Sequence, residues 1–561
     1  MINIRYICSK TCTLNNKCCN SKHWIFYKEQ YGGGKSQWTT LIHNGPLFPP
    51  PYEPHKIPVI INNESIILPP LAEEYATMYA RYLDTPYMKS NIFKKNFWKD
   101  FKSTININVK NIDEIDFSLI KNHLILEKQK KDELSKEEKL KIKSLQDEYE
   151  EPYKYCIIDG SKQQVGNYKI EPPGIFLGRG THPKLGTIKK RTFPEDITIN
   201  LSKGAPIPKP NLEGHKWGHI IHDSDVIWLA SWKENISGKN KYIFTSFDSF
   251  FKSKSDESKF DLAKQLKKKF NKIREDYEKE LESKELKNKQ LATALYFIDH
   301  LALRVGGNKD TKEEADTVGV TSLRVEHLTL LENNQIKLDF LGKDSIRYCK
   351  KVKVTESVYR NIELFIKDKT KKDDIFDLIN STMLNEYLNN IMPGLTAKVW
   401  RTFNASYLFQ KEIDKINHDK VMAIDVNERL NYLIAMFNQA NTDVAVLCNH
   451  QKNVTGSTEN ITKKIDEKLK QLKIKKEKYK ENKDKDKLAK IESQIKLLKI
   501  KKETKIKMKN VSLGTSKNNY IDPRIIFAFI KKYEIPPEKI FTKSLLKRFE
   551  WATKVDKDYK F

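Results

Sequence analysis

The segment from residue 456 to residue 509 is rich in lysine, yet its apolar residues recur at regular intervals. These residues are Ile461, Ile465, Leu469 and Leu472 in the first half, and Leu488, Ile491, Ile495 and Leu498 in the second. Steps of three and four residues place apolar side chains along one face of a helix. A polar run, KENKDKDK, separates the two halves. The segment therefore predicts two amphipathic helices that fold back as an antiparallel coiled-coil hairpin, with a flexible charged linker as the alternative.

Both ends of such a hairpin lie at its base, so the chain can return close to the point where it left. This explains why a compact stretch, SLGTSKNNYIDPR from Ser512 to Arg524, follows so much lysine-rich sequence. We therefore expect that residues 512–561 can dock on the main body.

The charge balance points to a polyanionic partner. The chain of 561 residues carries 102 Lys and Arg against 74 Asp and Glu, a formal net charge of +28. Nucleic acid is the first candidate and an anionic membrane surface the second. No stretch reaches the roughly 20 apolar residues of a membrane span, and the start lacks the apolar core of a secretion signal. Length predicts about three or four domains.

Cysteines fall into two groups. Cys156, Cys349 and Cys448 stand singly in apolar surroundings, as is typical of reduced thiols. Four others cluster near the start, at Cys8, Cys12, Cys18 and Cys19, without the Cys-x-x-Cys pair usual in zinc sites. We expect residues 1–22 to be a disordered leader, with a zinc site as the alternative.

Local patterns predict a mixture of helices and strands. Ser135 and Glu138 form a capping box at the start of a helix. Residues 260–305 have helical periodicity that stops at a glycine pair. Strands are expected at residues 225–232, 241–247, 322–331, 335–341 and 345–354. The last two flank the sequence GKDS, which places Lys343 at a hairpin tip.

A tyrosine late in the chain becomes interesting only if cations surround it. A phenol has a pKa near 10, so ionising Tyr520 at neutral pH costs about 4 kcal/mol. Without such cations, Tyr520 is interpreted as a packing residue. Candidate cations are Arg304 at a helix end, Arg401 within an apolar helix, His450 after an apolar run and Lys343 at the hairpin tip. Taken singly these read as internal salt bridges, a satisfied core histidine and a solvated turn lysine.

Taken together, the five residues fit one reaction on a phosphodiester. Arginines neutralise the non-bridging oxygens, and the histidine donates a hydrogen bond to one of them. The lysine protonates the departing 5′ oxygen, and the tyrosine attacks and is held as a phosphoester. Composition and spacing permit this set but do not select it over chance.

The chain resembles the family of eukaryotic-type DNA topoisomerase IB from about Trp24 to Phe561. The stretches that carry the resemblance include NGPLFPPPYEP, KIEPPGIFLGRGTHPK, ITINLSKGAPIP, ALYFIDHLALRVGG, FLGKDSIRY, GLTAKVWRTFNAS, AVLCNHQK and LGTSKNNYIDPR. Many such blocks in one order make the resemblance specific.

The resemblance implies a role for each matching residue. Tyr520 corresponds to the nucleophile that forms a 3′-phosphotyrosyl bond, Arg304 and Arg401 to phosphate-binding arginines, His450 to the family histidine and Lys343 to the general acid. Arg179, Asp344 and Asn519 correspond to residues that line the cleavage site. Further DNA contacts are implied at Lys241, Tyr242, Gly306, Gly307, Asn308, Lys309, Thr396, Ala397 and Lys398.

The resemblance also implies an architecture and a biochemical setting. It gives an α+β multidomain chain: a mixed α/β N-terminal DNA-binding cap at 23–250, and a mainly helical, recombinase-like catalytic core with a small antiparallel sheet at 251–455. The coiled-coil linker at 456–509 and the C-terminal domain at 510–561 follow. Such a protein relaxes supercoiled duplex DNA in the nucleus as a monomeric, bilobed clamp, largely without sequence preference and without ATP, cofactor or metal.

Two other readings stay open at this point. A site-specific tyrosine recombinase shares the same catalytic residue types, and a basic chromatin-binding protein could retain the fold without the activity. The chain also departs from the family pattern in its short N-terminal region, its short linker, the VGGN loop after Arg304, and Asn518 where leucine is common. None of these departures removes a candidate catalytic residue.

Overall fold

The computed structural model describes residues 37–106, 109–307, 309–311, 313–450, 457–481, 485–507 and 511–561. The cysteine cluster and the expected leader lie outside these residues. The chain divides into two compact units, and each is described by itself. The first contains the described residues up to Leu177 together with Lys184–Ser249. The second contains the short segment Gly178–Pro183 and all residues from Phe250 to Phe561.

The first unit is built from small sheets. Their strand orders are β1(Leu41–His43)-β5(Tyr155–Ile158)-β6(Ser161–Gln164), β3(Glu64–Ile66)-β2(Val59–Ile61)-β4(Ile115–Asp116), β10(His219–Ile221)-β9(Ile197–Asn200)-β11(Trp228–Lys233)-β12(Asn240–Phe244) and β7(Gly174–Ile175)-β8(Ile188–Lys189). The neighbouring strands are antiparallel except β9 and β10, which are parallel. The strands expected at 225–232 and 241–247 are confirmed as β11 and β12, although each is shorter than its pattern.

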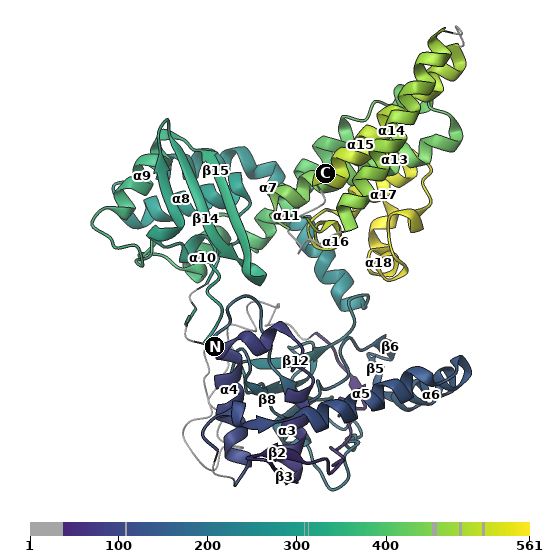
Figure 1. Cartoon of the computed structure of the whole chain (residues 1–561). Coiled ribbons are helices and arrows are strands. Elements are labelled where there is room, and N and C mark those ends of the chain that lie inside the picture. The colour runs from purple at the N-terminus through teal and green to yellow at the C-terminus, as the bar shows by residue number, and fades with distance from the viewer. Residues whose placement is uncertain are drawn as a thin grey trace. The chain divides into compact units, whose positions relative to one another are not determined.

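Three helices of the first unit, α3(Pro70–Ala80), α4(Asn91–Phe101) and α5(Ser118–Glu133), contribute to its largely aromatic core. A fourth helix, α6(Lys136–Glu150), follows α5, and its apolar side chains are exposed (Figure 1). Tyr79 of α3 stacks on Phe97 of α4 with ring centroids 4.4 Å apart. The predicted capping box is confirmed: the Ser135 hydroxyl accepts from the Glu138 amide, and the Glu138 carboxylate accepts from the Ser135 amide.

The second unit places a three-stranded antiparallel sheet beside a buried helix. The sheet has the order β13(Leu328–Leu331)-β14(Gln335–Gly342)-β15(Ile346–Lys353). The helical stretch predicted over 260–305 is two helices, α7(Phe250–Glu280) and α8(Leu286–Leu301). At the break, the buried Asn361 side chain donates to the Leu281 carbonyl, a tertiary contact that periodicity does not reveal.

The strand predicted over 322–331 is wrong in its first half. Only Leu328–Leu331 is a strand, and Val320–Ser322 and Val325–His327 form short 3₁₀ turns. The reason is a loop partner: the Leu323 carbonyl accepts from Ile375, and the Val325 amide donates to the Asp373 carbonyl. The helices α9(Glu356–Ile366) and α10(Ser381–Ile391) follow the sheet.

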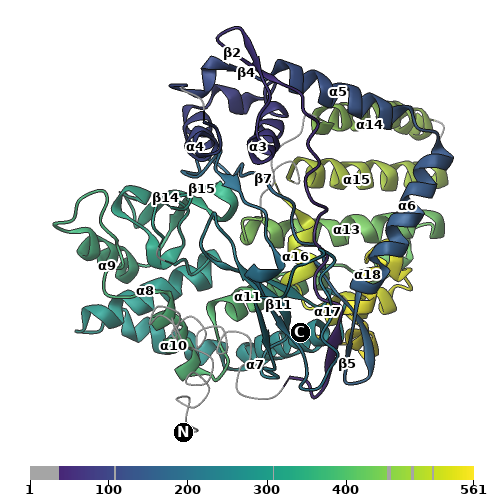
Figure 2. The same ribbon diagram turned by 90° about the horizontal axis from the view of Figure 1, so that it is seen from below.

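Long helices fill the rest of the second unit. They are α11(Ala397–Asp414), α12(His418–Met422), α13(Val426–Leu447), α14(Ser457–Glu481) and α15(Lys485–Lys507). Figure 2 shows α13, α15 and α14 side by side. The side chains of Leu469, Leu472, Ile491 and Ile495 are buried together between α14 and α15.

The chain then ends in short helices, α16(Leu513–Asn519), α17(Pro523–Lys532) and α18(Lys543–Arg548), which share the hydrophobic core of the second unit. No helix in the described part of the chain is long and apolar enough to cross a membrane. The fold is thus a mixed α/β, multidomain arrangement with small, mostly antiparallel sheets.

Candidate active site

Arg304 lies just beyond the end of α8. The helix stops because Ala302 adopts a left-handed conformation, with φ +49°. The loop that follows is held by backbone bonds from the Val320 amide to the Arg304 carbonyl (2.9 Å) and from the Thr321 amide to the Val305 carbonyl (2.8 Å). These bonds fix the backbone from which the Arg304 side chain leaves.

A pair of glycines makes this arrangement feasible. Gly306 has φ +86°, and a Cβ at Gly319 would lie only 2.4 Å from the Gly306 nitrogen. Two backbones therefore touch at a place where no larger residue fits. The glycine that sequence reasoning assigned to DNA contact, Gly306, has a clear structural role in positioning Arg304.

Arg401 is a buried arginine of α11, and backbone carbonyls accept hydrogen bonds from its side chain. Its Nε donates to the Ala302 carbonyl at 2.7 Å, and its Nη2 donates to the Cys448 carbonyl at 3.1 Å. Its Nη1 donates to the Tyr520 hydroxyl at 3.1 Å. The guanidinium is fixed by neutral carbonyls rather than by a carboxylate, so its positive charge is not cancelled by these bonds.

Tyr520 follows α16 directly, and its backbone is anchored. Its amide donates to the Ser516 carbonyl at 2.9 Å, and its carbonyl accepts from the Ser406 hydroxyl at 3.0 Å. The side chain is buried, with the Arg401 guanidinium carbon 5.0 Å from its ring centre. The phenol oxygen is thereby held against a cation.

His450 lies beside Tyr520, with ring centroids 5.1 Å apart. Burial first, and then the charges of Arg401 and Arg304, lower the pKa of His450 to about 3. The imidazole is therefore neutral at physiological pH. Its Nδ1 is 2.7 Å from the Ser516 hydroxyl, while its buried Nε2 forms no hydrogen bond within the described residues.

This depressed pKa predicts a pH effect on stability. The unfolded histidine takes up a proton below its ordinary pKa of 6.5, whereas the folded one does so only near 3, so stability falls as pH drops through that window. Between pH 7 and pH 5 the loss from this one group is about 2 kcal/mol. Over the same interval, the free energy of unfolding of His450→Gln should therefore fall by about 2 kcal/mol less than that of the wild-type protein, as measured by urea unfolding. His219→Gln, which removes an exposed histidine, is the control. Equal losses in wild type and His450→Gln would contradict the assigned burial effect.

Lys343 and Asp344 lie at the turn between β14 and β15. Gly342 pairs with Ile346 across the hairpin, and the turn residues Asp344 and Ser345 have positive φ values of 68° and 57°. Lys343 is exposed at this turn, as its sequence predicts. The Asp344 carboxylate forms an ion pair with Arg179, which belongs to the Gly178–Pro183 segment of the same unit.

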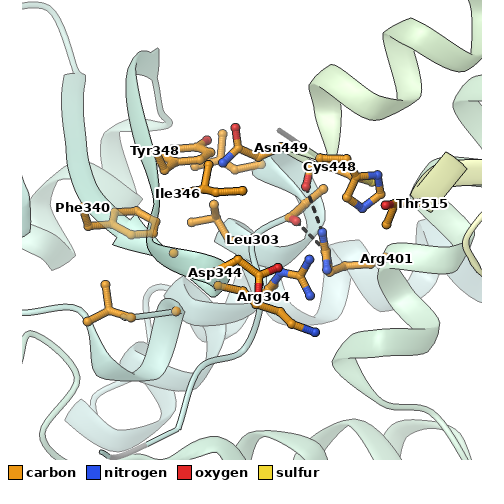
Figure 3. A pocket seen from close by; sticks show the side chains of 17 residues that line it. Leu303, Arg304, Phe340, Asp344, Ile346, Tyr348, Arg401, Cys448, Asn449 and Thr515 are labelled. Atoms are coloured by element: carbon orange, nitrogen blue, oxygen red, sulfur yellow. Dashed lines mark hydrogen bonds between the residues drawn. The ribbon is translucent and has the colours of Figure 1, made fainter. Parts of the chain in front are cut away.

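These side chains converge on one pocket of about 100 Å³ (Figure 3). Its polar lining includes Arg304, Lys343, Asp344, Arg401, His450 and Thr515. Figure 3 shows Arg304 and Asp344 near Arg401, with Phe340, Ile346 and Tyr348 forming an apolar wall on the strand side. Tyr520 reaches this pocket through its bond to Arg401.

The Arg304 guanidinium is a second cation of this pocket. It is only partly exposed, and it forms neither an ion pair nor a hydrogen bond within the described residues. Burial and then the nearby charge of Arg401 lower the pKa of Arg304. The Asp344 carboxylate in the same lining offsets part of this charge. Two guanidiniums held close together, neither of them in an ion pair within the described residues, still favour an anion such as phosphate.

The other expected contact residues are more dispersed. Gly307 and Lys309 lie in the loop after Arg304, and Asn308 lies outside the described residues. Thr396 caps α11 by accepting from the Val399 amide, and Lys398 is exposed in the first turn. Asn519 is exposed at the end of α16, and its carbonyl accepts from Lys259. Lys241 and Tyr242 lie on β12 of the first unit.

Ala397, the first residue of α11, is held inside the protein. Its side chain is buried, and its amide donates to the Asn385 side chain at 3.0 Å. The residue therefore packs the start of α11, and its role as a DNA contact stays a prediction.

Sequence reasoning missed Ser516, Ser406 and Thr515. Ser516 contacts His450, Ser406 contacts the Tyr520 backbone, and Thr515 lines the pocket. For Ser516 a signal exists, because it precedes Tyr520 by one helical turn in the stretch LGTSKNNY. Across the described residues, no cluster of three or more His, Cys, Asp or Glu side chains is arranged to hold a metal ion.

Comparison with known proteins covers nearly the whole chain. Residues 36–245 match the DNA binding fragment of eukaryotic DNA topoisomerase I, residues 248–483 match its catalytic core, and residues 492–561 match the C-terminal topoisomerase domain. DNA topoisomerase 1 of Candidozyma auris is 39% identical, over 95% of this chain and 84% of that protein. DNA topoisomerase 1 of Homo sapiens is 42% identical, over 95% of this chain and 73% of that protein. With its cationic pocket and the adjoining tyrosine in place, the chain belongs to the eukaryotic DNA topoisomerase I family and is a type I DNA topoisomerase.

Proposed function

We propose that the protein relaxes supercoiled duplex DNA by a type IB reaction in which Tyr520 is the nucleophile. One strand is cut, the free 5′ end rotates about the intact strand, and the cut is resealed. The observation that carries this proposal is the bond from Arg401 to the Tyr520 hydroxyl at the edge of a pocket where the Arg304 guanidinium forms no ion pair within the described residues.

The pocket residues bind the scissile phosphate. Arg304 and Arg401 neutralise its non-bridging oxygens, and His450 donates a hydrogen bond to one of them through Nε2. The negative charge on these oxygens grows in the transition state, so donors fixed in advance stabilise that state more than the ground state. Arg401 suits this role because its other donors are already held by backbone carbonyls.

The chemical step is an in-line substitution at phosphorus. The Tyr520 oxygen forms a bond to phosphorus while the bond to the 5′ oxygen breaks, and the phenol proton passes to water. Lys343, exposed on the hairpin turn, gives a proton to the departing 5′ oxygen. The product is a 3′-phosphotyrosyl bond. Because this bond retains the energy of the phosphodiester, resealing is the reverse reaction and requires neither ATP nor a metal ion.

We infer that duplex DNA is bound with little sequence preference through its phosphates. The net charge of +28 supports this, since phosphate contacts supply most non-specific affinity. The contact residues that we assign in addition to the catalytic five are Arg179, Lys241, Tyr242, Gly306, Gly307, Asn308, Lys309, Asp344, Thr396, Ala397, Lys398 and Asn519.

The setting of the reaction follows from the same proposal. The N-terminal cap at 23–250 and the catalytic core at 251–455 act as a monomeric clamp around the duplex in the nucleus. The coiled-coil linker at 456–509 brings the C-terminal domain, residues 510–561, to the core. The pairing of Leu472 with Ile491 and Ile495 in one buried cluster supports the linker assignment.

A plasmid assay tests the proposed activity directly. We expect the purified protein to relax both negatively and positively supercoiled plasmid in EDTA without nucleotide, because the protein's own cations stabilise the transition state. Relaxation should weaken steeply with added salt. Agarose gels of the topoisomers give the readout, and folded protein that leaves the plasmid supercoiled under these conditions would refute the proposal.

A further inference from the structure

Whether the His450 imidazole can donate a hydrogen bond to a phosphate depends on which of its two ring nitrogens carries the proton. A neutral imidazole carries one N–H, and the nitrogen that bears it is set by the hydrogen bond of the other nitrogen. His450 is 4% exposed, and its Nε2 has no protein partner among the described residues. Only the tautomer with the proton on Nε2 can donate to a bound phosphate oxygen.

Ser516 is the group that contacts the other nitrogen. Its side chain has no exposed surface, and its hydroxyl oxygen is 2.7 Å from His450 Nδ1. The described residues provide the Ser516 hydroxyl with no other hydrogen-bond partner. The backbone carbonyl of the same serine accepts from both the Tyr520 and the Ile521 amides, at 2.9 and 3.0 Å.

The two directions of this bond are not equivalent. If Ser516 donates, Nδ1 accepts, Nε2 carries the proton, and this N–H is the one group left without a partner among the described residues. If His450 donates instead, two buried groups lack partners there, the Ser516 hydroxyl hydrogen and the unprotonated Nε2, and each unmet buried polar group is costly. The first arrangement is therefore favoured.

We infer that Ser516 is a positioning residue: its hydroxyl donates to Nδ1, fixes His450 in the Nε2–H tautomer and aims that N–H at the scissile phosphate. The inference rests on the proposed role of His450 and adds to it the group that makes the role available. Because the Ser516 carbonyl also holds the Tyr520 amide, one turn of α16 orients both the nucleophile and the hydrogen-bond donor.

The first test reads the tautomer without any mutation in the site. Protein labelled with ¹⁵N-histidine is examined by long-range ¹H–¹⁵N correlation, and His450→Gln identifies the His450 signals by their loss. The inference expects a protonated Nε2 and an unprotonated Nδ1 in the wild-type protein. A protonated Nδ1 would overturn it.

The second test asks whether Ser516 acts through His450. Single-turnover cleavage of a nicked oligonucleotide that cannot religate is measured for Ser516→Ala, His450→Gln and the double variant. Ser516→Ala should slow cleavage by roughly 10- to 100-fold, as for the partners that orient metal-bound histidines, while DNA affinity stays the same. In the His450→Gln background the same change should have almost no further effect. Ser516→Thr, which keeps the hydroxyl, should recover part of the rate.

Ser406→Ala is the matched control, because Ser406 is also a buried serine, but among the described residues its hydroxyl bonds to the backbone at Tyr520 and Asp522 rather than to His450. It should leave the His450 tautomer unchanged, and its cost should persist in the His450→Gln background. If Ser516→Ala also slows cleavage in the His450→Gln background, the inference is overturned. If His450→Gln cleaves at the wild-type rate, the proposed donor role of His450 is refuted instead. The tautomer spectrum of the wild-type protein would then still decide the assignment of Ser516.

Discussion

Tyr520→Phe should abolish plasmid relaxation and covalent attachment to DNA while leaving DNA binding close to normal. The change removes the attacking oxygen and its bond to Arg401 but keeps the buried ring in place. Loss of one such hydrogen bond costs the fold only about 1 kcal/mol, so the protein should remain folded. The measurement is transfer of label from a 5′-end-labelled cleavable strand to the protein on a denaturing gel, beside binding by fluorescence anisotropy.

Tyr407→Phe provides the control for this experiment. Tyr407 lies on α11 in the same unit, and 48% of its surface is exposed. This variant should form the adduct at the wild-type rate. A labelled adduct formed by Tyr520→Phe would show that another residue attacks the phosphate.

Arg401→Ala should lower the rate of cleavage by roughly 10²- to 10³-fold or more, equal to about 3–4 kcal/mol of transition-state stabilisation. The guanidinium is the group that links the tyrosine hydroxyl to the phosphate pocket, and its removal also leaves the buried carbonyls of Ala302 and Cys448 without their donor. Arg401→Lys should recover only part of the loss, because an ammonium cannot reproduce the planar set of donors. Single-turnover cleavage rates at saturating protein give the comparison.

Arg360→Ala is a suitable control for the loss of an arginine. Arg360 is an exposed residue of α9 that pairs with Glu356 on the same helix, and its removal should leave the cleavage rate unchanged. Cleavage by Arg401→Ala within a fewfold of wild type, with the protein folded, would rule out the assigned role of Arg401.

Spacing and local chemistry were sufficient to predict several elements of the fold. The three- and four-residue steps from Ile461 to Leu498 mark the region of α14 and α15, and the Ser135–Glu138 capping box marks the start of α6. The turn at Lys343 follows from the short polar connection between two alternating strands. In each case the signal is local, so a single sequence contains it.

Other features depend on contacts between distant residues. The break between α7 and α8 coincides with a bond from Asn361, and the lost half of the predicted 322–331 strand reflects pairing with residues near Asp373. The helix α8 ends at Ala302, whose backbone is left-handed although the residue is not a glycine, so the sequence does not predict this end. Periodicity records which face of an element is apolar, and it carries no information about these partners.

For the candidate site, residue types suggested a reaction and the family resemblance supplied positions. Neither could show that the Arg304 guanidinium forms no ion pair with any described residue, that Ala397 is buried or that Ser516 contacts His450. These facts arise from tertiary packing. Supporting residues are harder to predict: the four-residue step to Tyr520 points to Ser516, but nothing in the sequence connects it with His450, 66 positions away.

The three partners of Arg401 have a consequence for how activity returns after denaturation. Ala302, Cys448 and the Tyr520 hydroxyl belong to residues 99, 47 and 119 positions away from Arg401 along the chain. Closing such distant loops is slow compared with forming a helix. During refolding, the circular dichroism of the long helices should therefore recover before DNA cleavage does, and the regain of cleavage marks the moment when the last long-range closure is complete.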